Sequence, residues 1–235
     1  MMDSMGQPTL VWAHGLLSSV AHDEENAILD WESLAQVARV VRYDTRGHGR
    51  AGTPYEERAY GWSAMVDDML WAFGDGPFVA GGVGMGAAVA LYAALRAPRR
   101  VQGLVLALPP PAWERRHRAA EACRIAAEAL DHEDPGVAVS MGVGVAQVKR
   151  MEFKVAAAIL RGAAQSDLPD RAEVADLVMP VVVLGCDGSD HPLETARELA
   201  DLLILGELHV GEAPGATQEW TAAVADLLAS IPQWD

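Results

Sequence analysis

The sequence predicts an α/β fold in which a mostly parallel sheet of about six strands is flanked by helices. Short apolar runs alternate along the chain with longer segments of helical periodicity, which is the pattern of parallel strands joined by crossover helices. One such unit, residues 79–91, passes from an apolar run through a glycine-rich turn into an alanine-rich helical pattern. With 235 residues and no linker-like stretch, the chain is expected to form a single domain, 1–235.

The strands are expected where apolar and β-branched residues concentrate. They are Thr9–Ala13, Val40–Asp44, Phe78–Gly81, Val101–Leu108, Val181–Gly185 and Leu208–Val210. The helices are expected at Ala27–Val37, Ser63–Phe73, Met85–Leu95, Leu193–Leu202 and Thr217–Leu228. Ser63 is predicted to cap its helix and Gly74 to end it. Residues 113–165 have a helical pattern throughout, which predicts a helical lid inserted into the domain.

The bulk composition narrows the function classes. A formal charge of -15 disfavours nucleic acid and anionic membrane surfaces as partners, because both repel an acidic protein. Residues 76–95 carry no charge, but five of them are glycines, so a buried strand, turn and helix is predicted there instead of a membrane span. Two distant cysteines, Cys123 and Cys186, and the absence of a signal-like N-terminus predict a cytoplasmic protein.

Polar and glycine-rich motifs follow the predicted strands. In a parallel sheet the carboxyl ends of the strands form the ligand crevice, so these motifs are expected to meet there. In chain order they are HGLLSS (14–19), DTRGHG (44–49), GVGMG (82–86), PPPAWERR (109–116) and GCDGSDHP (185–192).

Five motifs in this order resemble the α/β-hydrolase superfamily, with small bacterial hydrolases related to enol-lactonases as the best-matching branch. The resemblance spans nearly the whole chain, which begins at what would be the third strand of the full family sheet. It implies that GVGMG is the turn that carries a nucleophile, usually written G-x-S-x-G. It also implies that the backbone N–H groups of Leu16 and Met85 form an oxyanion hole, and the alternative that these groups only bind water is equally favoured.

The departures from the family pattern concern all three catalytic positions. On the resemblance, the nucleophile falls on Gly84, the acid on Gly188 and the base near Ala216. A glycine cannot form an acyl-enzyme. An engineered serine-to-glycine replacement would alter one position only, so natural divergence is the favoured explanation and the engineered variant the weaker one.

Other ionisable residues remain candidates for chemistry. His14 is either a general base or a residue that fixes its turn, and the structural role is favoured. Asp187, Asp190 and His191 form either a proton relay or a surface loop in which an aspartate caps a helix, and the loop is favoured. Ser18 and Ser19 are displaced nucleophiles or helix caps, and capping is favoured. Ser18 is also expected to line the pocket.

In the lid, Trp113 is expected to form a pocket wall. The basic run Arg115, Arg116, His117 and Arg118 is either a grip for a substrate carboxylate or a solvated helix face, and the solvated face is favoured. The run Asp131 to Asp134 is interpreted as a polar turn, so no metal site is predicted. Arg46 and His48 are expected to fix their loop, and His209 to pack within its strand.

No cofactor is predicted. The G-x-G-x-G spacing within GGVGMG follows the third strand instead of opening the chain, and no Walker lysine is present. The sequence therefore favours a protein that binds a small molecule under the lid without serine chemistry. The alternative is an active hydrolase, lyase or isomerase that uses the oxyanion donors with His14 or Asp187 as base.

Overall fold

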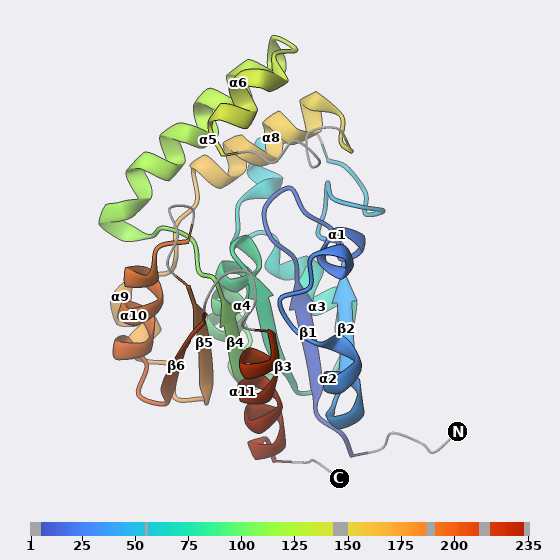
Figure 1. Ribbon diagram of the computed structural model, residues 1–235, viewed down its shortest axis with the longest axis vertical. Coiled ribbons are helices and arrows are strands. Elements are labelled where there is room, and N and C mark those ends of the chain that lie inside the picture. The colour runs from blue at the N-terminus through green and yellow to red at the C-terminus, as the bar shows by residue number, and fades with distance from the viewer. Residues whose placement is uncertain (1–5, 55, 143–149, 187–190, 212–216, 233–235) are drawn as a thin grey trace.

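The computed structural model describes residues 6–54, 56–142, 150–186, 191–211 and 217–232, and its core is one parallel sheet (Figure 1). The six strands are ordered β2-β1-β3-β4-β5-β6, and each neighbouring pair is parallel. They are β1 (Thr9–Ala13), β2 (Arg39–Tyr43), β3 (Phe78–Val83), β4 (Val101–Ala107), β5 (Val181–Gly185) and β6 (Gly206–Val210). The predicted fold class is confirmed.

Strand boundaries shift where pairing includes residues that are not apolar. β2 begins at Arg39, which pairs with Thr9 of β1, whereas the apolar pattern begins at Val40. β6 begins at Gly206 and includes Glu207, because both residues pair with β5. An edge strand exposes one side, so polar residues are tolerated there and the apolar pattern understates its length.

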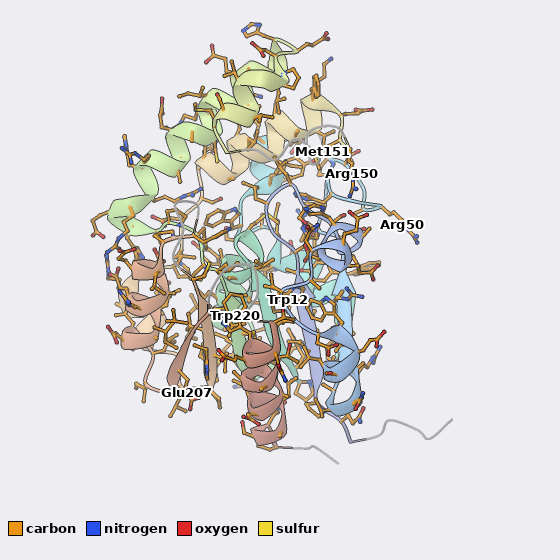
Figure 2. The ribbon with its side chains drawn as sticks, viewed as in Figure 1. Trp12, Arg50, Arg150, Met151, Glu207 and Trp220 are labelled. Carbon is orange, nitrogen blue, oxygen red and sulfur yellow. The ribbon has the colours of Figure 1, made fainter. Side chains whose placement is uncertain are left out.

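Helices cover both faces of the sheet, giving three layers (Figure 1). One face carries α3 (Val66–Phe73), α4 (Met85–Arg96) and α10 (Leu193–Leu202), and the other carries α2 (Trp31–Val37) and α11 (Thr217–Ser230). Trp12 of β1 and Trp220 of α11 are both buried in the layer between α11 and the sheet (Figure 2). Two short helices, α1 (Val20–Glu25) and α9 (Arg171–Ala175), were not predicted.

The structure corrects the predicted starts of two helices. α2 begins at Trp31 instead of Ala27, because the Asp30 carboxylate accepts hydrogen bonds from the backbone N–H groups of Glu32 and Ser33, each at 3.1 Å. α3 begins at Val66 and has no side-chain cap, so Ser63 does not cap it. Gly74 ends α3 at φ +78° as predicted.

A helical insert connects β4 to β5 and lies over the carboxyl ends of the strands (Figure 1). Its described residues include η2 (Trp113–Arg115), α5 (Arg116–Asp131), α6 (Pro135–Ser140) and α8 (Phe153–Ala164). The insert packs on η1 (Glu57–Tyr60). A Cβ atom added to Gly162 of α8 would lie only 2.5 Å from Tyr60 Cβ, so the two backbones are in close contact. An exposed ion pair of 3.1 Å between Arg150 and Glu25 also links the segment before α8 to α1 (Figure 2).

Candidate functional site

The glycine-rich turn between β3 and α4 has a sharply bent backbone. Gly84 adopts φ +56° and ψ -113°, a region that side chains rarely occupy. Its N–H donates to the carbonyl of Ala107 at 3.0 Å, and its own carbonyl accepts from Ala87 N–H at 3.1 Å. The strand, turn and helix therefore present residue 84 at the carboxyl edge of the sheet, immediately before the first turn of α4.

The glycines on either side of Gly84 are required by packing. A Cβ atom on Gly86 would lie 2.9 Å from the His14 carbonyl oxygen and closer still to that of Ala13. A Cβ atom on Gly82 would lie 2.7 Å from the Ala13 carbonyl oxygen. At Gly84 the nearest atom to such a Cβ is His191 Cε1, at 3.1 Å. Gly82 and Gly86 thus hold α4 against the end of β1, whereas Gly84 faces a side chain that can move.

The strand order places this turn at the switch point of the sheet. β1 lies between β2 and β3, so the connections after β1 and β3 diverge to opposite sides and leave a crevice between them. Gly15 follows β1 and Gly84 follows β3, and both line a cavity of about 710 Å³ that lies between the sheet and the helical insert.

The cavity wall is largely apolar, with a few polar groups. Leu16, Trp31, Trp62 and Leu160 are among its apolar residues. Its polar and ionisable members are Ser18, His22, Asp23, Asn26, Arg115, Arg116, Arg118, Cys123 and His191. Such a combination is typical of sites for small organic molecules.

Two backbone N–H groups are available in this wall. Leu16 and Met85 both line the cavity, and neither N–H donates to an acceptor among the described residues. Met85 is the first residue of α4, so its N–H belongs to the unpaired amides at a helix start and carries the favourable end of the helix dipole. The two N–H groups can donate hydrogen bonds to an anionic oxygen or to a carbonyl oxygen.

The turn after β1 is fixed by two buried histidines. His14 Nδ1 lies 2.8 Å from the Gly15 carbonyl and must donate, whereas Nε2 accepts the Thr45 N–H at 3.1 Å. His48 Nδ1 donates to the Arg46 carbonyl at 2.9 Å and Nε2 accepts the Leu17 N–H at 3.1 Å. Both rings are therefore neutral and have a defined tautomer. The structure places His14 in this turn and outside the cavity wall.

Burial keeps both rings uncharged. Desolvation is the largest cause lowering the pKa of His14, partly opposed by its bond to the Gly15 carbonyl. Desolvation, followed by repulsion from His14, lowers the pKa of His48 to about 3. Protonating either ring would also break the bond that its Nε2 accepts. Protons therefore bind preferentially to the unfolded chain.

The protein is expected to lose stability as the pH falls from about 6.5 towards 3. His48 titrates near 6.5 when unfolded and near 3 when folded, so the free energy of unfolding should drop by ~1.4 kcal/mol per pH unit within this window. A His48→Gln variant should show a flatter dependence between pH 6.5 and 5 in urea titrations. The exposed His117→Gln variant should retain the original slope. Equal slopes in all three proteins would contradict this assignment.

A serine and an aspartate form a hydrogen-bonded pair in the cavity wall. Ser18 Oγ donates to Asp23 Oδ1 at 2.9 Å. Burial is the main cause raising the pKa of Asp23, opposed by His14 and by the hydrogen bond from Ser18. Ser19, in contrast, caps α1 by accepting the His22 N–H at 3.2 Å. Capping therefore describes Ser19, while Ser18 lines the cavity. Asp23 was not predicted as a site residue, because an acidic residue in the first turn of a helix ordinarily only complements the helix dipole.

Arg116 is the one member of its basic run that is buried, at 8% exposure. Its Nε donates to the Ser166 carbonyl at 2.7 Å, its Nη2 donates to the Ala163 carbonyl, and its guanidinium carbon lies 4.5 Å from the centre of the Trp62 ring. No carboxylate among the described residues forms an ion pair with it. Within the described part of the chain, the cavity wall thus contains a cation without a direct counter-charge.

The remaining predicted residues have other positions. The Trp113 indole N–H donates to the Pro169 carbonyl at 3.0 Å, and the structure places its side chain outside the cavity wall. Arg46 forms hydrogen bonds of 2.7–3.0 Å with the Asp68 carboxylate, which fixes its loop. His209 Nε2 lies 3.8 Å from Glu207 Oε2, and both residues belong to β6. The predicted positions Asp187, Gly188, Asp190 and Ala216 lie outside the described residues.

The remaining observations concern the Asp134 turn, metal ligands, the two cysteines and membrane-spanning helices. Asp134 accepts hydrogen bonds from Gly136 and Val137 and caps α6. Within the described ranges, no three His, Cys, Asp or Glu side chains converge to hold a metal ion. Cys123 and Cys186 do not form a disulfide. No helix in the described part of the chain is long and apolar enough to cross a membrane.

Comparisons with known proteins agree with this geometry. A family model described as alpha/beta hydrolase fold matches residues 8–122. An enol-lactonase from Burkholderia xenovorans superposes with a TM-score of 0.70 at 19% identity, covering 95% of this chain and 92% of the other. MenH from S. aureus gives 0.72 at 21% identity, with 94% and 93% coverage. A thermophilic esterase from Thermogutta terrifontis, with malate bound, gives 0.73 at 21% identity, with 94% and 89% coverage. No curated protein sequence matches the chain.

Proposed function

Because this chain belongs to the α/β-hydrolase superfamily, we propose that it uses the superfamily's pocket to bind a small organic molecule and makes no covalent serine intermediate. The carrying observation is Gly84, which lies on the sharp turn between β3 and α4, where the resemblance puts the nucleophile, and opens on the cavity without a side chain. An acyl-enzyme needs a side-chain nucleophile there. The helical insert would then serve as the lid, and the protein would work in the cytoplasm.

The cavity supports a ligand with an apolar body and a carboxylate. A volume of about 710 Å³ lies in the range of pockets for drug-sized molecules. Arg116 lies in its wall without an ion-pair partner among the described residues, and it occupies the first position of α5. The start of a helix is the positive end of its dipole. The charge of Arg116 adds to that positive potential, which favours the binding of an anion. A carboxylate on Arg116 would relieve the desolvated charge.

The proposal is tested with a fluorophosphonate that reacts with serine nucleophiles and with 4-phenylbutyrate as the binding probe. We expect no fluorophosphonate adduct in mass spectra, and binding of 4-phenylbutyrate in calorimetry. Arg116→Met should weaken binding tenfold or more, because a charge-assisted hydrogen bond contributes ~1.5–3 kcal/mol.

Two controls separate ligand contact from folding. Arg124→Met removes an exposed arginine of the same helix that pairs with Glu121, and should bind as the parent does. The uncharged analogue 4-phenylbutanol should bind the parent and Arg116→Met with similar affinity. A stoichiometric fluorophosphonate adduct, or an affinity for 4-phenylbutyrate that is the same in Arg116→Met as in the parent, would contradict the proposal.

A further inference from the structure

His191 lies directly against the position where the superfamily has its nucleophile. A Cβ atom on Gly84 would be 3.1 Å from His191 Cε1 and 4.0 Å from His191 Nδ1, with the Leu108 carbonyl oxygen also at 4.0 Å. His191 and Gly84 both line the cavity, together with Leu16 and Met85. An imidazole therefore faces the point from which a substrate carbonyl would be attacked.

The glycine and the histidine are complementary in space. A Cβ separation of 3.1 Å is closer than nine in ten real Cβ contacts, so any larger residue at position 84 must displace the ring. With glycine, the volume that a serine side chain would fill stays open to the cavity. Nδ1 is the ring neighbour of the nearer atom Cε1, so a water oxygen in this open volume can take a position beside Cε1 and within hydrogen-bond reach of Nδ1.

We infer that His191 is the general base for attack by a water molecule that takes the place of the serine hydroxyl. This inference rests on the proposed use of the cavity for a small ligand, and it adds turnover to binding. His191 would touch the attacking water itself, so its role is catalytic. The sequence motif GCDGSDHP contains the residue, but only the fold brings it to Gly84.

The reaction balances with water as the single co-reactant. The water oxygen bonds to the substrate carbonyl carbon while one water proton moves to the imidazole. The carbonyl electron pair moves to its oxygen, which the Leu16 and Met85 N–H groups stabilise. When the carbonyl re-forms, the bond to the leaving oxygen breaks, and the imidazolium returns its proton to that oxygen. The products are a carboxylic acid and an alcohol, phenol or enol.

The absence of a covalent intermediate restricts the substrate class. Water attack without an acyl-enzyme gives up the division of the reaction into two easier steps. The leaving oxygen must therefore be a weak base that departs readily. Esters and lactones of phenols or enols meet this condition, and esters of simple aliphatic alcohols do not.

The test uses p-nitrophenyl butyrate as substrate with the intact protein. We expect turnover by the parent and a 10²- to 10⁴-fold lower kcat in His191→Gln, the range for loss of a general base, with KM changed much less. Added imidazole should restore turnover to His191→Gly above the rate at which imidazole alone hydrolyses the ester, which a structural role would not produce. His117→Gln removes an exposed histidine of α5 and should match the parent. Ethyl butyrate should not be hydrolysed.

Each outcome is decisive. Unchanged kcat in His191→Gln, or failure of imidazole to rescue His191→Gly, overturns the inference. An acyl adduct in mass spectra overturns it as well, and an adduct on Cys123 would identify another nucleophile in the cavity. If 4-phenylbutyrate binds but p-nitrophenyl butyrate is not turned over, the proposed binding function stands and the role of His191 is rejected. If neither binding nor turnover occurs, the proposed function itself fails.

Discussion

Replacing Gly86 with alanine is expected to destabilise the protein by at least ~3 kcal/mol, or to prevent folding. Helix propensity alone predicts the opposite sign, because alanine is favoured over glycine within a helix by ~1 kcal/mol. Packing decides against propensity here. The added methyl group would collide with the Ala13 and His14 carbonyl oxygens, which belong to the backbone where β1 ends and cannot rotate away.

Urea unfolding measured by circular dichroism tests this prediction. The control is Gly52→Ala, because nothing lies within 4 Å of a Cβ atom at Gly52 and its φ is not positive. That variant should change the free energy of unfolding by less than ~0.5 kcal/mol. A Gly86→Ala protein as stable as the parent would show that α4 does not approach β1 as closely as the structure has it.

The Gly84→Ser variant is expected to become reactive towards a fluorophosphonate, from no adduct in the parent to stoichiometric labelling. The new hydroxyl would project towards His191, whose Nδ1 lies 4.0 Å from the Cβ position, and the Leu16 and Met85 N–H groups would stabilise the phosphonyl oxygen. A side chain at φ +56° costs of order 1–3 kcal/mol, so the variant should be less stable than the parent yet folded.

Two further variants test whether the labelling depends on His191 and on the position of the serine. Gly84→Ser combined with His191→Gln should label at least ~100-fold more slowly, since it lacks the base. Gly52→Ser places a serine in open space and should remain unlabelled. A folded Gly84→Ser protein that does not react would show that residues besides position 84 prevent serine chemistry. Reaction would show that the rest of the scaffold still supports a serine.

The sequence sufficed for the centre of the sheet because the four central strands are buried and mostly apolar. β1 and β5 coincide with their predicted ranges, and GVGMG was correctly placed between strand and helix. Helix starts were less predictable because they depend on local side-chain bonds. Asp30 determines the start of α2. The apolar periodicity alone extends the helix back to Ala27 and does not reveal the cap.

The site was only partly predictable, for a different reason. Leu16, Met85, Ser18 and His191 line the cavity as candidate residues, because each follows a strand at the same edge of the sheet. The contact between His191 and Gly84 depends on how two separate loops pack, and no local pattern encodes that distance. The sequence also does not indicate which residues of a charged run are buried. Arg116 and its neighbours form one basic run in the sequence, but only Arg116 is buried.

The close contact between Gly162 and Tyr60 has a kinetic consequence. There is no room for even a methyl group between α8 and the segment beneath it, and Trp62 N–H also donates to Ser166 Oγ at 3.1 Å. Lifting the insert away as a rigid hinge would break these contacts together. We therefore expect a ligand to enter while α8 stays seated on Tyr60, so that the association rate constant falls as the ligand becomes bulkier.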